Sequence, residues 1–405
     1  MSTLKGTLMR RSVSERVRTL SLVSTASAAW AFCFGLGLPL GSLWLRDAGC
    51  NATAIGLCSS AYYFAVAITS LFLPWLMGRG AKFAVVAGMI VDGLTVMIFP
   101  LIDNYAGWVV LRLLGGASTA LCLIPLETLI NQNAAPESRA RDFSIYAVCV
   151  ALGVAAGSLV GLPLYPQAPG LAFMLGGAAA LFGAGLLWQG YPTHQPIATE
   201  SDTEARFRVR LNILSLGTAW AQGFMEAAML TFLSVHLLGL GYTAAATSTL
   251  VGGLFVGVVL VQIPGAWLAD KFGRLRVVVL CHMVVLAALI LLPRAQAPLP
   301  LALLLFAVGA SGAALYPLGL ALLGERVPPK SMARANSWYL ASNCAGSLMG
   351  PWLTGQLIDD IGPSGLFAAG FVASAAVLVS WLILSRRASA ARDFPSASEC
   401  NRAAA

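Results

Sequence analysis

The chain has 405 residues, of which 58% are hydrophobic and only 10% are charged, and its mean hydropathy is +0.79. A soluble domain usually carries about 25% charged residues, so this composition excludes a large soluble α-helical protein. The net charge of +8 would suit a nucleic-acid-binding protein, but the positions of the basic residues argue against that function.

Apolar runs long enough to cross a bilayer recur along the whole chain. Each run is too long for a barrel strand and lacks the alternation of a strand, so the sequence predicts an all-α integral membrane protein. The twelve predicted spans cover residues 21–45, 54–77, 83–102, 106–129, 143–163, 169–190, 211–236, 243–268, 277–293, 299–323, 335–357 and 364–385.

Basic residues gather on one side of these spans. If the N-terminus is cytoplasmic, 22 of the 25 Lys and Arg residues fall on the cytoplasmic side, Arg46 and Arg294 fall outside, and Arg112 lies within a span. This positive-inside bias explains the basic charge without nucleic acid. We expect a multi-pass protein of the bacterial inner membrane with two cytoplasmic tails, 1–20 and 386–405, and with an uncleaved first span.

Asp92 and Arg112 are ionisable residues inside the third and fourth predicted spans, at similar depth. Such groups cost about 2.5–3.5 kcal/mol each on insertion scales, so each needs a reason. One interpretation is a structural ion pair. The other places Arg112 beside a protonatable group or an anionic part of a substrate.

Glu127 lies near the cytoplasmic end of the fourth span. We expect it to pair with Arg79 or with a neighbouring basic residue of a loop, and so to help close the inner side.

A polar segment, 191–210, is the one clear linker, and it divides the chain into an N-terminal bundle, 21–190, and a C-terminal bundle, 211–385. The halves also align with each other. Residues 136–146 match residues 329–339 at an offset of 193, with Pro, Ser, Arg and Tyr all in register. Packing of small residues would explain matched glycines alone, so an internal repeat is predicted.

Glu226 lies near the middle of the seventh span, with Gln222 one turn before it and no basic residue in the same span. Apolar surroundings disfavour the charged form of a carboxyl group. Glu226 is therefore a candidate proton carrier, and the alternative is a protonated side chain that only forms hydrogen bonds within the bundle.

The loop of residues 265–276 places one acid and three bases between the eighth and ninth spans. It resembles the signature loop of the major facilitator superfamily, a large family of secondary transporters. The resemblance implies a gating role for this loop, which we call the gate loop. The residues that carry it are Gly265, Leu268, Asp270, Lys271, Gly273, Arg274 and Arg276.

The first-half counterpart, residues 75–82, is shortened and lacks the acid. We therefore expect the intact copy around Asp270 to carry more of the gating.

The resemblance implies two pseudo-symmetric six-helix bundles, with a site between them near the midplane. It also implies a cavity lined by the first, fourth, seventh and tenth helices. Arg112, followed by Gly115 and Gly116, resembles a fourth-helix motif that is linked with proton coupling in many members of the family. Residues 314–317 and 346–351 are similar to those of the YcaD-like branch of bacterial transporters.

Polar and aromatic residues on the expected lining helices are substrate candidates. Tyr146 and Tyr339 are related by the repeat and are expected to face each other across the cavity, and Trp30, Tyr316 and Asn343 complete the set. Few formal charges lie there, so we expect a neutral or singly charged organic solute. A planar aromatic vitamin such as riboflavin is one candidate, and efflux of drugs or metabolites is an alternative.

No paired acids, nucleophile triad or metal-ligand spacing is visible among the motifs, and the eight cysteines show no redox spacing. We therefore expect no enzymatic activity, no cofactor and no metal. The expected partners are a small-molecule substrate, a proton or other coupling ion and the lipid bilayer, with the protein a monomer. A membrane scaffold or sensor without flux remains an alternative from another class.

Overall fold

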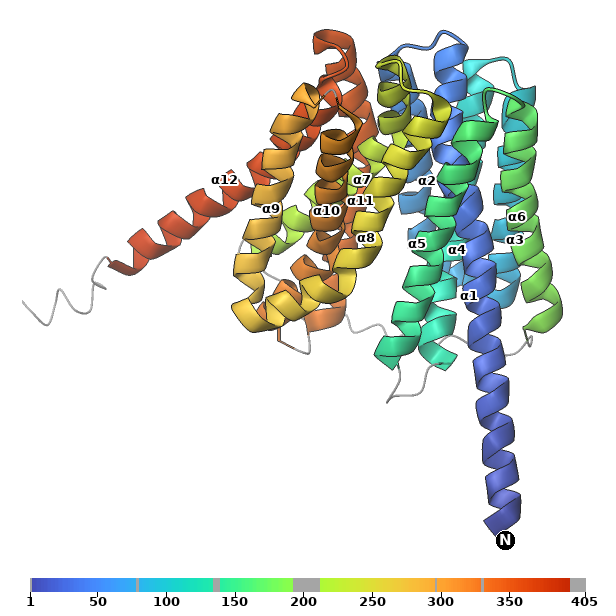
Figure 1. Ribbon diagram of the computed structural model, residues 1–405. Coiled ribbons are helices and arrows are strands. Elements are labelled where there is room, and N and C mark those ends of the chain that lie inside the picture. Colours follow the sequence, from blue (N-terminus) through green and yellow to red (C-terminus); the bar gives the residue numbers. More distant parts are fainter. Residues whose placement is uncertain are drawn as a thin grey trace, which may run out of the picture.

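The computed structural model describes residues 2–77, 80–133, 139–191, 212–295, 297–328 and 331–393. Within these ranges the chain forms twelve α-helices and no strand (Figure 1). The helices are α1 (Ser2–Asp47), α2 (Ala52–Met77), α3 (Ala81–Ile98), α4 (Tyr105–Asn133), α5 (Arg139–Leu164), α6 (Pro169–Gly190), α7 (Ile213–Gly239), α8 (Ala244–Phe272), α9 (Arg274–Leu291), α10 (Pro298–Arg326), α11 (Met332–Ile361) and α12 (Gly365–Asp393).

Each of the twelve predicted spans corresponds to one of these helices. Eleven of them are long and apolar enough to cross a bilayer, and α11 is the exception because it carries more polar residues. The helix α1 already begins at Ser2, so it extends beyond the predicted start of the first span. Apart from Tyr191, the predicted linker 191–210 lies outside the described residues.

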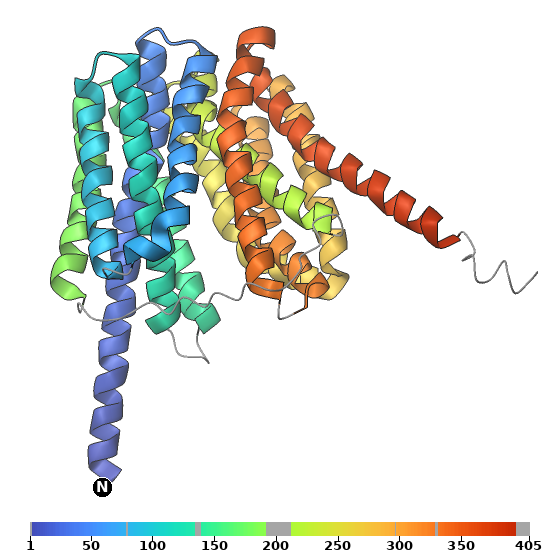
Figure 2. The same cartoon turned by 180° about the vertical axis from the view of Figure 1, so that it is seen from behind.

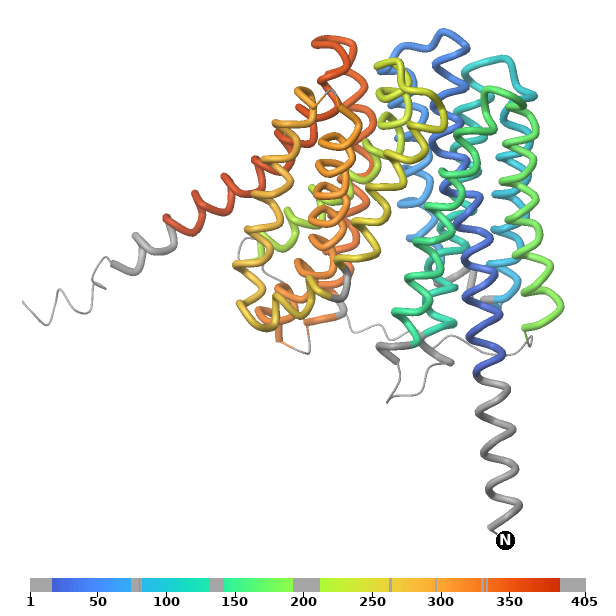
Figure 3. The backbone as a smooth tube through the Cα atoms, viewed as in Figure 1, coloured from blue at the N-terminus to red at the C-terminus, as the bar shows by residue number. Residues whose placement is uncertain are grey.

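Successive helices run in opposite directions, so their connections gather at two ends of the molecule (Figure 3). We call the end at which α1 begins the N-terminal face and the opposite end the far face. The connections between α1 and α2 and between α11 and α12 lie at the far face, and the gate loop lies at the N-terminal face (Figure 1).

The helices pack as two groups that repeat the same set of neighbours. In the first half α1 packs on α5 and α6, and α3 packs on α4 and α6. In the second half α7 packs on α11 and α12, and α9 packs on α10 and α12. Adding six to each helix number of the first half therefore gives the pairs of the second, so the two bundles are pseudo-symmetric.

Glycines matched by the repeat make equivalent close contacts in the two halves. A Cβ atom added at Gly157 of α5 would collide with the backbone of Phe32 in α1. A Cβ atom added at the matching Gly350 of α11 would collide with the backbone of Phe224 in α7. Close backbone approach at small residues is how helices associate in lipid, and it explains why these glycines recur.

Prolines inside helices leave carbonyl groups without their helical partner, and serines of other helices bind two of them. Pro39 has no N–H for the carbonyl of Gly35, and Ser158 of α5 donates to that oxygen at 2.7 Å. Pro163 likewise leaves the carbonyl of Leu159 free, and Ser248 of α8 donates to it at 2.9 Å. The second bond joins the two halves.

The halves meet mainly through α2 with α11 and through α5 with α8. Figure 2 shows α2 and α11 side by side from behind. At the far-face end of this contact, the carboxylate of Asp359 accepts hydrogen bonds from the backbone N–H groups of Ala52 and Thr53, at 3.0 and 2.8 Å. Further along α2, Ser60 donates to the carbonyl of Leu348 at 2.7 Å. These bonds close the far face.

Candidate functional site

A chain of polar side chains on α7 and α11 holds Glu226. The Asn343 amide donates to the side-chain oxygen of Gln222 at 2.6 Å, and the Gln222 amide donates to the Glu226 carboxylate at 2.5 Å. Gly223 lies between them, where an added Cβ would meet the backbone of Asn343, so the glycine allows α11 to come this close. The arrangement fixes the direction of the carboxylate.

The Glu226 side chain is exposed, although its neighbours Met225 and Ala227 in the middle of α7 are buried. Tyr63 of α2 and Tyr316 of α10 both lie within electrostatic range of its carboxylate. Because α2 belongs to the first half and α10 to the second, Glu226 has an electrostatic neighbour in each half.

Glu127 of α4 lies within electrostatic range of the same Tyr316 and also of Tyr146. Its side chain is half-buried. It has no ion-pair partner among the side chains that the structure describes, and the predicted partner Arg79 is outside those residues. Tyr316 is therefore an electrostatic neighbour of two acids, Glu127 of the first half and Glu226 of the second.

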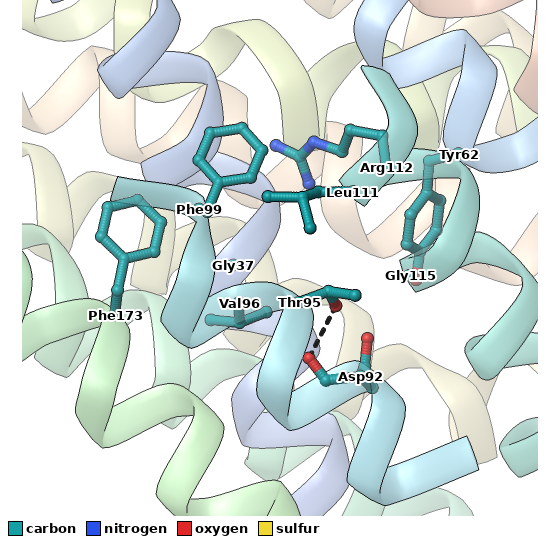
Figure 4. Close-up of a pocket in the computed structure, with 10 residues that line it drawn as sticks. All are labelled: Gly37, Tyr62, Asp92, Thr95, Val96, Phe99, Leu111, Arg112, Gly115 and Phe173. Carbon is teal, nitrogen blue, oxygen red and sulfur yellow. Dashed lines mark hydrogen bonds between the residues drawn. The ribbon is translucent and has the colours of Figure 1, made fainter. Parts of the chain in front are cut away.

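Asp92 and Arg112 lie in one pocket inside the first half, which Figure 4 shows in close-up. The two side chains are 4% and 6% exposed. The pocket holds about 20 Å³ that the centre of a water molecule can occupy, which is room for a single water. Its walls come from α1, α2, α3, α4 and α6 and from the short 3-10 helix after α3.

These two residues share the pocket without a direct ion pair among the described contacts. The Arg112 guanidinium donates to the carbonyl of Leu38 at 3.2 Å and lies over the Phe99 ring at 5.1 Å from its centroid. Asp92 accepts from Ser118 at 3.3 Å, and the indole N–H of Trp30 in α1 lies close enough to its carboxylate to act as a second donor.

The aromatic candidates lie elsewhere than expected. Tyr146 is 2% exposed in a first-half cluster with Trp30, and Tyr339 is fully buried in a second-half cluster. The Tyr339 hydroxyl donates to the carbonyl of Tyr316 at 2.6 Å. The two tyrosines therefore support the cores of their own halves and do not face each other, because each packs against a neighbouring helix of its own bundle.

In the gate loop, Arg274 makes the principal contacts. Gly273 has a φ of 91°, which favours glycine, and it turns the chain from α8 into α9. Arg274 then reaches α10, where it donates to the carbonyl of Ala321 at 3.0 Å and lies 3.3 Å from the Glu325 carboxylate. The gate loop is thereby bound to the end of α10.

Asp270 is the freer member of the gate loop. Its side chain is 70% exposed and lies 3.7 Å from Arg274. Lys271 covers the rings of Trp267 and Phe272 and does not contact an acid among the described residues. Gly265 is part of α8 and lies close to Ala314 of α10.

In the first half, the ammonium group of Lys82 donates to the carbonyl of Tyr191 at 2.6 Å and lies over the ring of Trp188. This counterpart of the gate loop is therefore bound to the end of α6.

Two contacts were not predicted from the sequence. They are the ion pair of Glu325 with Arg274 and the bonds of Asp359 to the start of α2. Glu325 and Asp359 looked like ordinary acids at helix ends. The absence of a close basic neighbour in sequence for Asp359 is the one signal that could have drawn attention to it.

Comparison with known proteins decides the family. The sequence profile described as Major Facilitator Superfamily matches residues 20–246 and 215–399. The chain belongs to the major facilitator superfamily. Its helix pairing, with two six-helix bundles, agrees with that membership.

Relatives place this superfamily member near a branch of bacterial transporters. It is 24% identical to the uncharacterized MFS-type transporter YfkF of Bacillus subtilis (strain 168), over 83% of this chain and 88% of that protein. It is 26% identical to the uncharacterized MFS-type transporter YcaD of Salmonella arizonae, over 80% of this chain and 85% of that protein. The predicted YcaD-like branch is confirmed.

Solved structures with the same fold include two solute transporters. The nucleoside transporter NupG matches with a TM-score of 0.72 at 14% identity, covering 94% of this chain and 100% of that one. A D-xylose-proton symporter matches with a TM-score of 0.71 at 14% identity, covering 90% and 97%. At this identity the likeness concerns the fold alone, and the chain is a secondary transporter by its family.

Proposed function

We propose that this protein is a proton-coupled transporter that moves a small organic solute across the bacterial inner membrane by alternating access. The observation that carries the proposal is Glu226, an exposed carboxylate in the middle of α7 that Gln222 and Asn343 hold in place. An ionisable group at that depth costs free energy to insert, and such groups usually mark a functional site. Glu226 would bind and release the coupling proton and contact the solute.

The charged residues near Glu226 limit which charge the solute can carry. Arg112, a basic residue inside α4, is turned into the first-half pocket, where it binds the carbonyl of Leu38. Glu127 and Glu226 therefore face the interior without a described basic residue beside them. A neutral solute with hydrogen-bond donors, or one with a single positive charge, fits this environment better than an anion.

The closed far face supports alternating access. The described side-chain hydrogen bonds between the halves lie in the far-face parts of α2, α5, α8 and α11. The proposal assigns this conformation to the end state in which the far face is closed.

We place the N-terminal face in the cytoplasm. The gate loop with its three bases lies there, together with Lys82 and Arg334, whereas Arg46 and Arg294 lie at the far face. Positive residues concentrate on the cytoplasmic side of membrane proteins.

The test is transport by purified protein in proteoliposomes with an imposed proton gradient, using a panel of vitamins and cationic, neutral and anionic drugs. We expect the wild-type protein to move at least one solute in response to the gradient. Glu226→Gln keeps the size and the hydrogen bond from Gln222 but cannot release a proton, so it should lose the response to the gradient.

Asp103→Asn, which removes an exposed acid between α3 and α4, is the matched control and should retain transport. A Glu226→Gln protein that still accumulates solute under the gradient would contradict the proposed role of this residue. Absence of flux for the wild-type protein over the whole panel would favour a scaffold or sensor.

A further inference from the structure

The start of α2 is capped in an unusual way. The first N–H groups of a helix have no hydrogen-bond acceptor within the helix. The side chain of the residue just before the helix normally accepts a hydrogen bond from one of them. Here Asn51 accepts from the N–H of Ala54 at 2.9 Å, as a normal cap does. The N–H groups of Ala52 and Thr53 are bound instead by Asp359, 307 and 306 residues away in α11.

The matching helix of the second half, α8, has an N-terminal cap from its own half. The start of α8 is capped by its own Thr243, whose hydroxyl accepts from the N–H of Ala246 at 3.2 Å. The long-range cap is therefore not a general consequence of the repeat. It is a property of α2 and α11, and it exists only while the two helices touch.

The backbones at this contact are as close as they can be. A Cβ atom added at Gly355 of α11 would collide with the carbonyl of Ala52, and one added at Gly56 of α2 would collide with the carbonyl of Pro351. The two glycines thus let Asp359 reach the end of α2. A larger residue at either position would hold the helices apart.

We propose that Asp359 is a positioning residue for transport: its carboxylate binds the N-terminus of α2 only when the far face is closed, and so it sets how much of the protein occupies the closed-far-face state. We call Asp359 with the N–H groups of Ala52 and Thr53 the far-face latch. The negative charge also interacts favourably with the positive end of the α2 dipole. When the far face opens, those N–H groups and the carboxylate turn to water.

The inference rests on the proposed alternating access, but its test needs no solute. Spin labels are attached at Ala48 and Ser364, exposed loop residues of the two halves, in protein whose natural cysteines have been replaced. Pulsed electron paramagnetic resonance in lipid nanodiscs then gives the populations of short and long distances across the far face.

We expect Asp359→Ala to raise the ratio of open to closed far face by about fivefold, the size of a typical lost N-cap. Asp359→Asn should have a smaller effect, since asparagine still caps helices but lacks the charge. Asp360→Ala removes the adjacent exposed acid, for which no bond to α2 is described, and should leave the distances unchanged.

Gly355→Ala provides a second route that does not depend on hydrogen bonds, because it should oppose closure sterically and raise the open population further. Gly185→Ala is its control, since nothing lies within 4 Å of a Cβ atom at that glycine of α6. Equal distance populations in wild type, Asp359→Ala and Gly355→Ala would overturn the latch. A lack of solute flux would count against the proposed function and leave the distance result standing.

Discussion

At the scale of single residues, position in the helix identified the chemically important groups, and the neighbours from other helices decided what each could do. Glu226 was recognisable because an acid without a basic neighbour in its span is rare. The hydrogen bond from Asn343 to Gln222, which holds the Glu226 carboxylate in place, could not be predicted, because these two residues are 121 positions apart. Asp92 and Arg112 illustrate the same limit, since they share a pocket as their depth suggested, yet each binds other groups.

Asp270 gives a prediction at this scale. Its side chain is 70% exposed and forms one described surface ion pair, with Arg274, and exposed pairs contribute about 0.2–1 kcal/mol. Asp270→Asn should therefore leave the melting temperature in detergent almost unchanged. If the acid finds its main partner when the N-terminal face closes, the same change should strongly reduce the transport rate.

The comparison for Asp270→Asn is Lys82→Ala in the first-half counterpart of the gate loop, where Lys82 binds the carbonyl of Tyr191. We expect the smaller loss of transport from Lys82→Ala. Equal or reversed effects would show that the first-half loop carries as much of the gate as the second.

At the scale of helices, the sequence predicted the twelve elements because length and apolarity are local properties. It also predicted an internal repeat, because Pro, Ser, Arg and Tyr recur at one offset, and the structure shows that matched glycines make equivalent backbone contacts in the two halves. It did not predict which side chain would bind the carbonyls that prolines leave free. That choice depends on helix crossings, as with Ser158 and the carbonyl of Gly35.

The contact between Ser158 and Gly35 can be tested with a double-mutant cycle. Ser158→Ala should lower the free energy of unfolding by about 0.6 kcal/mol, the average for interhelical hydrogen bonds in a membrane protein, and by no more than about 1.7 kcal/mol, the maximum found there. In a Pro39→Ala background the restored N–H can bind the carbonyl of Gly35, so the same serine change should cost much less. Unfolding in mixed detergent micelles measures all four proteins, and equal costs in both backgrounds would exclude this pairing.

At the scale of the whole molecule, the two halves are joined at the far face by few polar contacts, so the balance between conformations depends on groups such as Asp359. Desolvation is the largest single effect on this carboxyl and raises its pKa, but the hydrogen bonds from Thr53 and Ala52 together outweigh it. The net result is a pKa below the ordinary 3.8. Closure thus stabilises the ionised form.

The sign of the pH dependence follows. A depressed pKa in the closed state means that the latch contributes fully above about pH 3.8 and loses its contribution as the pH falls through the lowered value. Labels at Ala48 and Ser364 report this latch. Between about pH 5 and 8, protonation of Asp359 should therefore not change the distances between them. Asp359→Asn and wild type should show parallel pH profiles over that range, whereas a difference that grows toward pH 5 would mean that Asp359 titrates during transport.

The membrane location, the twelve helices, the repeat of two bundles and the family can all be predicted from the chain alone, because hydropathy, charge bias and the residues of the gate loop are local properties. Which polar groups meet became known from the folded molecule: Asn343 with Gln222 and Glu226, Asp92 and Arg112 around one small pocket, and Asp359 with the start of α2. The physical reason is that a hydrogen bond requires two groups within about 3 Å. For residues hundreds of positions apart, that distance is set by how the helices cross and by which of the two faces is closed.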